Sequence, residues 1–162
     1  MIVVGIVFRG SCWIEGVMHT QIAIDGFDAT ERLASMINSS PHCKQLRLVM
    51  LNGITFAGFN IVDIKTLNTA TRLPVIALTL DKPDLEAIHK ALDNLSKSEE
   101  RWKMILEAGE IHKVCCHGKQ IYVETAGISL ADATEIVKLT SIRSNYPEPL
   151  RVAHLIASGV SN

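Results

Sequence analysis

Two short stretches of the sequence place polar residues where apolar, strand-like runs end. Asp25 and Asp28 follow one such run, and Asn52 with Gly53 follows another at 46–51. Two carboxylates at the end of a strand can hold a hard divalent cation, because such ions take oxygen ligands. The same residues also suit a local role, in which Asp28 caps a helix and Asp25 closes a turn. Spacing alone leaves both interpretations open.

The segment LNGITFAGFN (51–60) carries a second candidate site. We expect Thr55, Phe56, Phe59 and Asn60 to be exposed on a Gly-rich loop, where aromatic rings can stack on a nucleobase. Alternatively, both phenylalanines fold back under the sheet. The side chain of Asn52 can orient a ligand through its amide, but it cannot neutralise a cation as a carboxylate does.

A third candidate lies near the C-terminus, in the segment PEPLRVAH. Glu148, Arg151 and His154 follow one another at three-residue steps, so they share one side of a helix, and Arg143 precedes them. Arginines at the start of a helix suit phosphate. A structural ion pair between Glu148 and Arg151 is the alternative.

The cysteines do not point to a metal site or a disulfide framework. Cys115 and Cys116 are adjacent, and in a strand adjacent side chains point to opposite faces, so the two do not easily share one ion with His112 and His117. Four cysteines without framework spacing indicate a reducing, cytoplasmic setting.

Length and composition predict one globular domain over residues 1–162. The chain has 162 residues, of which 48% are hydrophobic and 20% charged, which suffices for a full core. No apolar run reaches the roughly 18 residues that a membrane span needs. A net charge of −1 excludes a protein that coats nucleic acid by charge alone, so nucleic-acid binding requires a local site.

The elements that position these residues follow from hydrophobic periodicity and from capping signals. We predict strands over 2–8, 13–24, 46–51 and 73–80, a hairpin over 114–124, and helices over 28–38, 60–69, 83–95, 98–109, 129–137 and 147–159. Antiparallel hairpins mixed with crossovers predict an α/β fold, a mixed sheet with helices on both faces. If the strands that end at Asp25 and Asn52 are neighbours, their ends form one pocket.

Six segments resemble the archaeal endonuclease dU family, distant relatives of endonuclease V in the ribonuclease H-like superfamily. They are GIVFRG (5–10), IDGFDATERL (24–33), LRLVMLNGITFAGFNIVDI (46–64), LPVIALTLDKPDLEAI (73–88), YVETAGIS (122–129) and RSNYPEPLRVAHLIASGV (143–160). The last segment also resembles the C-terminal helix of endonuclease V. The resemblance covers nearly the whole chain.

This resemblance implies a ribonuclease H-like fold with a mixed sheet of about five strands. It also implies a metal-dependent endonuclease of DNA repair, which hydrolyses a phosphodiester in damaged or deaminated DNA with magnesium or manganese. On this basis the catalytic candidates are Asp25, Asp28 and Asn52, with Asp25 and Asn52 at the metal.

The substrate-binding candidates follow from the same resemblance. Gly53, Thr55 and Phe56 would line the pocket at the strand end, and Asn60 would shape it. Arg143 and Arg151 would then face the DNA backbone.

The chain departs from the family pattern in two places. The family opens with a strand that ends in a Gly-Ile-Asp-Asp-type motif, whereas Met1 here begins what matches the second strand, and the family's Leu-Asp-Gly is Leu51-Asn52-Gly53. Two functions therefore stay open: an endonuclease with an impaired metal site, or a catalytically inactive nucleic-acid-binding or assembly module. If the pocket is otherwise intact, Asn52→Asp is expected to raise magnesium affinity.

The missing first strand also has a structural consequence. The IVVGIVF segment would lose a neighbour and expose an apolar edge. We expect either edge pairing between subunits, which makes a homodimer, or a start codon upstream.

Overall fold

The computed structural model describes residues 1–160, and its elements follow the predicted order except for two further short strands at 55–56 and 60–61. The strands are β1 (Ile2–Arg9), β2 (Trp13–Gln21), β3 (Val49–Asn52), β4 (Thr55–Phe56), β5 (Asn60–Ile61), β6 (Val75–Thr79), β7 (His112–Cys116) and β8 (Lys119–Ala126). The helices are α1 (Ala29–Ser39), α2 (Ile64–Thr71), α3 (Leu85–Leu92), α4 (Ser98–Glu107), α5 (Leu130–Thr140) and α6 (Glu148–Val160).

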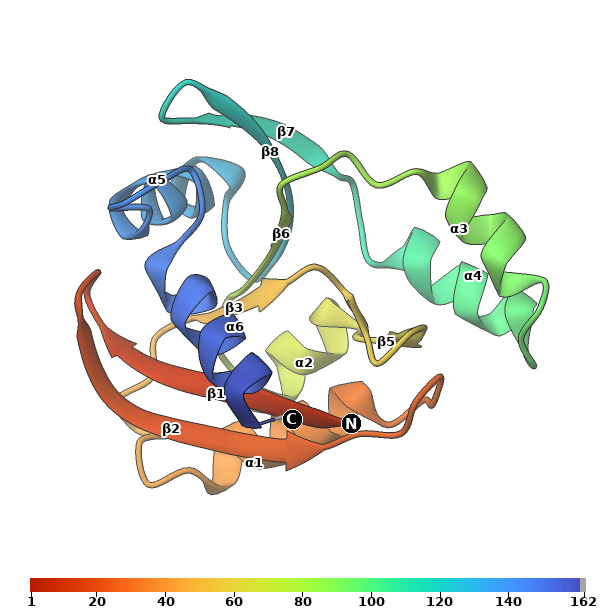
Figure 1. Cartoon of the computed structure of the whole chain (residues 1–162), viewed down its shortest axis with the longest axis horizontal. Helices are drawn as coiled ribbons and strands as arrows, with labels where there is room; N and C mark the ends of the chain where they lie inside the picture. The colour runs from red at the N-terminus through yellow and green to blue at the C-terminus, as the bar shows by residue number, and fades with distance from the viewer. Residues whose placement is uncertain (161–162) are drawn as a thin grey trace.

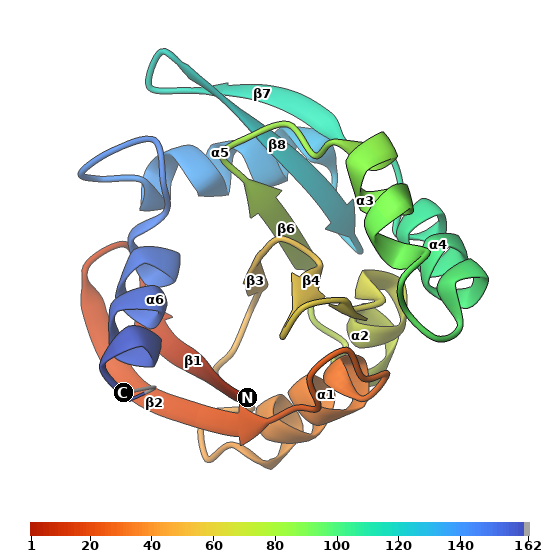
Figure 2. The same cartoon turned by 45° about the vertical axis from the view of Figure 1, so that its right-hand side comes forward.

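The strands form separate sheets. The largest has the order β3-β6-β8-β7, with β3 parallel to β6 and the other pairs antiparallel, so it is mixed as predicted. The hairpin of β1 and β2 is a sheet of its own, and both views show it at some distance from the β3-β6-β8-β7 sheet (Figure 1 and Figure 2). The strands that precede Asp25 and Asn52 are therefore not neighbours, because β2 and β3 lie in different sheets.

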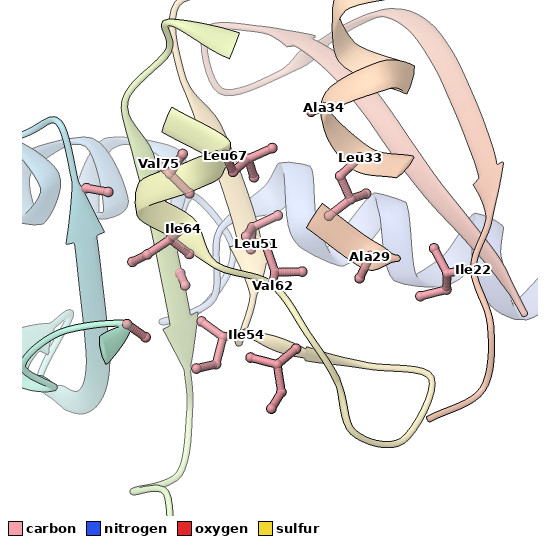
Figure 3. Close-up of a cluster of buried hydrophobic side chains, with 14 of the residues drawn as sticks. Ile22, Ala29, Leu33, Ala34, Leu51, Ile54, Val62, Ile64, Leu67 and Val75 are labelled. Carbon is pink, nitrogen blue, oxygen red and sulfur yellow. The ribbon is translucent and has the colours of Figure 1, made fainter. Parts of the chain in front are cut away.

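Helices cover both faces of the four-stranded sheet. Alternate residues of β6 point to opposite faces. On one face Val75 and Ala77 pack in a cluster with residues of α1, α2 and α4, and on the other Ile76 and Leu78 pack with residues of α5 and α6. Figure 3 shows part of the first cluster, where Leu33 points from α1 toward the strand residue Leu51. This arrangement confirms the α/β fold class.

The boundaries of several elements differ from the prediction because local capping decides them. The helix predicted over 60–69 starts only at Ile64, since the Asp63 carboxylate accepts the N–H groups of Lys65 and Thr66 at 3.0 Å each and caps the helix there. Residues 60–61 instead pair with residues 55–56 as a short antiparallel ladder. The second strand ends at Gln21 rather than at 24.

Within residues 1–160, no helix is long and apolar enough to cross a membrane.

The turn predicted at Gly118 is confirmed: it joins β7 to β8, and Gly118 has φ +78°. Cys115 is exposed and Cys116 buried, so the two thiols do point to opposite faces of the strand.

Candidate nucleic-acid site

Asp25 joins two loops that are far apart in sequence. Its N–H donates to the carbonyl of Ala57 at 2.9 Å, and its Oδ1 accepts the N–H of Phe59 at 2.8 Å. A Cβ on Gly58 would lie 2.2 Å from that Oδ1, so only glycine fits at this position. Asp25 itself has φ +49°, a left-handed conformation that these bonds hold in place. Its carboxylate thus ties the loop after β2 to the loop before β5.

Asp28 and Asn60 form the second tie between the same loops. The Asp28 carboxylate accepts the N–H of Ala23, at 3.1 and 3.4 Å, and accepts the side-chain amide of Asn60 at 2.6 Å. The hydrogen bond from Asn60 is the main cause that holds the pKa of Asp28 below its usual value. The Asn60 Oδ1 accepts the N–H of Ala29 at 3.0 Å, so Asn60 caps α1.

The capping prediction for this helix is therefore wrong in its detail. Asp28 does occupy the N-cap position of α1, but its side chain makes no cap hydrogen bond. The carboxylate turns back to Ala23, and Asn60 supplies the capping oxygen. Asn60, predicted to be exposed, is fully buried.

A buried arginine completes this junction, which we define as the loops at 22–28 and 57–60. The Arg101 guanidinium donates to the carbonyls of Asp25, Gly26 and Phe59, and its Nε donates to the carbonyl of Ser96. Only 2% of the side chain is exposed. The guanidinium also stacks over the exposed Phe27 ring at 4.1 Å from its centroid.

The residues of the junction do not fit a divalent cation. Oδ1 of Asp25 and both oxygens of Asp28 already accept protein N–H groups, and Arg101 adds a buried positive charge beside Asp25. Across residues 1–160, no group of three or more His, Cys, Asp or Glu side chains lies where it could hold a metal ion. Asp25 does not line the cavity that Asn52 lines, so the structure does not bring these two predicted ligands to one cavity.

The loop after β3 divides between two cavities. Asn52, Phe56 and Ala57 line a cavity of about 880 Å³, whereas Gly53 and Thr55 line a separate pocket of about 190 Å³. The smaller pocket lies at the carboxyl end of β3, where sites form in open α/β sheets, and the larger cavity reaches that end through Asn52. The predicted strand-end pocket is thus two pockets, with Asn52 and Phe56 on one and Gly53 and Thr55 on the other.

The smaller pocket contains an acid that the sequence did not single out. Glu124 lies on β8 opposite Ala77, is 8% exposed and lines the pocket with Thr55 and Thr79. In the described part of the chain its carboxyl group accepts no hydrogen bond and pairs with no cation. Burial raises the pKa of Glu124 to about 7, so this group changes charge near neutral pH.

The two loop phenylalanines are not free stacking platforms. Phe56 and Phe59 are half-buried and pack against the core cluster that contains Leu51 and Ile61. The structure therefore favours the second interpretation, in which both rings fold back against the core, over exposed rings that stack on a nucleobase. Thr55 is exposed, as predicted.

The start of α6 is an ion cluster centred on one buried acid. The Glu148 side chain is 7% exposed and accepts two hydrogen bonds from Arg151, at 2.5 and 2.8 Å, while Arg143 lies 3.3 Å away. These bonds, first those from Arg151, hold the pKa of Glu148 below its usual value. The side chains of Arg143 and Arg151 stay 71% and 38% exposed, so both keep N–H groups open to a phosphate.

Two residues that matter here were not predicted from the sequence. Arg101 sits in an exposed-looking run, SEERWK, and its burial depends on three carbonyls contributed by distant loops. Glu124 interrupts the otherwise apolar and hydroxylic run IYVETA, and a single acid in a buried strand is a signal that could have marked it.

Three comparisons describe what the chain is similar to. The family model described as endonuclease dU matches residues 1–161. The UPF0215 protein of Methanosarcina mazei is 51% identical over 163 residues, which cover 99% of this chain and 83% of that protein. A crystal structure of a protein of unknown function from Archaeoglobus fulgidus is 42% identical, with a TM-score of 0.92, over 98% of this chain and 89% of the other.

A more distant likeness concerns the fold alone. Endonuclease V of Ciona intestinalis, in complex with a 24mer DNA that contains an inosine followed by a ribo-adenosine, is 14% identical, with a TM-score of 0.55 over 91% of this chain and 72% of that one. The fold is thus the ribonuclease H-like α/β fold expected from the resemblance, here as a four-stranded mixed sheet and a separate hairpin.

Proposed function

Because this chain belongs to the endonuclease dU family, we propose that it recognises damaged or deaminated DNA, and that residues 1–160 bind this DNA without cleaving it. The family match over residues 1–161 is the observation that carries the proposed recognition of DNA. The likeness of fold to an endonuclease V that was solved with an inosine-containing DNA supports DNA as the substrate class.

The start of α6 is the surface best suited to the DNA backbone. Arg143 and Arg151 together carry two positive charges against the single negative charge of Glu148, so the cluster stays positive in a chain with a net charge of −1. Arginine binds phosphate through a planar fork of N–H donors. Glu148 orients both guanidinium groups, and its burial fixes the cluster to the body of the protein.

The hydrogen bonding of the acids supports binding without cleavage. Asp25 and Asp28 hold loops together through their carboxylates, and Asn52 is an amide, so no set of oxygen ligands for magnesium or manganese gathers at one place in residues 1–160. Hydrolysis of the phosphodiester is the second candidate function, favoured by the name of the family.

One experiment separates the two candidates. The purified chain is incubated with end-labelled oligonucleotides that carry one deoxyuridine or deoxyinosine, with magnesium or manganese, and the products are run on denaturing and native gels. We expect retarded mobility and no cleavage. Metal-dependent cutting near the modified base would overturn the claim that residues 1–160 only bind. The absence of both cleavage and retardation for every oligonucleotide would overturn both functions.

The binding surface is tested with paired variants that remove the same charge. Arg143→Gln with Arg151→Gln is expected to weaken DNA binding about tenfold and to lower its salt dependence. Lys90→Gln with Lys103→Gln removes two exposed charges on α3 and α4, which lie on the opposite side of the molecule from α6 (Figure 2), and should leave binding nearly unchanged. Equal losses in both pairs would mean that α6 is not the binding surface.

A further inference from the structure

The cavity of about 880 Å³ runs along the edges of two strands. Every residue of 1–10 and every residue of 46–52 lines it. Successive side chains of a strand point to opposite faces, so a cavity on one face would touch alternate residues only. Contact with every successive residue places the cavity beside the main chain of β1 on one wall and of β3 on the other.

Both of these edges lack a partner strand. Within residues 1–160, β1 pairs only with β2, and β3 pairs only with β6. Yet the runs IVVGIVF at 2–8 and LRLVML at 46–51 have the unbroken apolar character of strands that are buried on both faces in the middle of a sheet. Long apolar edges of this kind are a liability, so proteins normally cover them.

Helices close the cavity above and below the plane of the strands. Leu33, Met36 and Ile37 of α1 line it, and so do Leu150 and Ala153 of α6. Leu33 packs in the cluster on one face of the four-stranded sheet, and Leu150 packs in the cluster on the other. A group in the cavity would therefore meet apolar side chains on both faces and main-chain edges on both sides.

We propose that this cavity is a binding site for one β-strand. The strand is an apolar segment that corresponds to the part of the longer relatives that has no match in this chain. A strand of seven or eight residues, apolar on both faces, matches the lengths of 46–52 and of β1. It would hydrogen-bond to β1 and to β3 and join the hairpin and the four-stranded sheet into one sheet. Its edges would then lie about 5 Å from each neighbour.

The relatives supply the reason for this choice of occupant. The Methanosarcina mazei protein matches 99% of this chain with only 83% of its own length, so about a sixth of that protein has no counterpart in residues 1–162. A second copy of this chain is a poorer occupant. Every strand in its residues 1–160 already pairs with a neighbour, so it offers no single strand with both edges free.

Peptide binding tests the proposal without DNA, so its failure is distinct from failure of the proposed function. Overlapping 12-residue peptides that cover the unmatched residues of the Methanosarcina mazei protein are titrated into the full chain, and hydrogen exchange of the chain is followed by mass spectrometry. We expect one peptide to bind and to slow exchange at least tenfold in residues 2–9 and 49–52, but not in β7.

Matched changes in the protein and in the peptide test the geometry. Ala153→Phe places a ring in the cavity and should weaken peptide binding at least tenfold, whereas Ser158→Phe adds the same ring to an exposed position of α6 and should not. Should Ala153→Phe fail to fold, proline at the centre of the bound peptide gives a second test, because it removes a ladder N–H and should abolish binding to the unaltered chain.

Three outcomes would overturn the proposal. The first is that no peptide binds, and the second is that a peptide binds but leaves hydrogen exchange in β1 and β3 unchanged. The third is that light scattering shows a dimer and that hydrogen exchange shows residues 2–9 to be protected in this dimer before any peptide is added. The last result would identify a second copy of the chain as the occupant.

Discussion

Nδ2 of Asn60 lies 2.6 Å from Oδ1 of Asp28, so this contact joins the first residue of β5 to the residue that precedes α1. Through its Oδ1 and Nδ2, Asn60 also accepts the N–H of Ala29 and donates to the carbonyl of Ala23. One fully buried amide therefore satisfies the start of α1 and fixes Asp28. Nearly isosteric substitutions at this position change charge and hydrogen bonding with little change in volume.

Asn60→Asp is expected to lower the free energy of unfolding by about 2–4 kcal/mol at pH 7, because a carboxylate would replace the amide donor beside Asp28. The loss should shrink toward pH 4, where one of the two carboxyl groups takes up a proton. Urea unfolding at both pH values measures this, with Asn94→Asp, at an exposed position, as the control. An equal loss relative to the natural chain at the two pH values would contradict the 2.6 Å contact.

Arg101→Lys is expected to destabilise the chain by about 2–3 kcal/mol, although it keeps the positive charge. Lysine has no planar fork and cannot reach the carbonyls of Asp25, Gly26 and Phe59 together. Thermal unfolding followed by circular dichroism measures the loss. Arg9→Lys serves as the control, because the Arg9 side chain pairs with Glu15 but is 70% exposed, and it should change stability by less than about 0.5 kcal/mol. A loss no larger than the control's would show that the guanidinium does not join the loops.

Local patterns in the sequence predict the elements of this fold well, but not the junction. The order of strands and helices follows from periodicity and from Gly, Pro and Ser-Asp signals such as Ser129 with Asp132, whose capping bond is 3.1 Å. Burial of Asn60 and Arg101 depends on contacts with residues 31 to 76 positions away, which no local pattern encodes. The same holds for Asp25 and Asp28, whose carboxylates accept hydrogen bonds from Phe59 and Asn60, more than 30 positions away, and so are not free to bind a cation.

The separation of the β1-β2 hairpin from β3 likewise cannot be predicted from the sequence. The two apolar runs at 2–8 and 46–51 predict strands buried on both faces, and each forms. Whether they lie side by side depends on what fills the space between them. That space is the cavity of about 880 Å³, so the shared pocket expected for Asp25 and Asn52 does not form in this arrangement.

Asn52→Asp alone is not expected to create a magnesium site. Asn52 is exposed at the end of β3, and the carboxylates of Asp25 and Asp28 do not line its cavity. Among residues 1–160, the one acid that does line it, Glu15, is paired with Arg9 at 2.9 Å, so the new carboxylate would lack the free acidic partner that magnesium needs. Isothermal titration with magnesium should show a dissociation constant weaker than about 1 mM for both the natural chain and the variant. A magnesium affinity at least tenfold higher in the variant would mean that further oxygen ligands reach Asn52.

Glu124 should make the stability of the chain depend on pH near neutrality. Burial raises its pKa from 4.5 to about 7 in the folded state, so the folded chain holds this proton more tightly than the unfolded chain does. Stability is therefore fully present below about pH 4.5 and falls as the pH rises through 7, by about 3 kcal/mol for a shift of this size. Glu124→Gln removes the titrating group. Between pH 4.5 and 8, the decrease in the free energy of unfolding should therefore be about 3 kcal/mol smaller for this variant than for the natural chain.

Glu110→Gln provides the matched control for this comparison, because it makes the same chemical change at an exposed position. Its pH dependence should follow that of the natural chain. Urea unfolding curves at pH 4.5, 6, 7 and 8 for the three proteins give the comparison directly. Parallel pH dependence in Glu124→Gln and the natural chain would show that the Glu124 carboxyl is solvated through the pocket of about 190 Å³ that it lines. In that event the group would stay charged at neutral pH, and the pocket would be open to water rather than apolar.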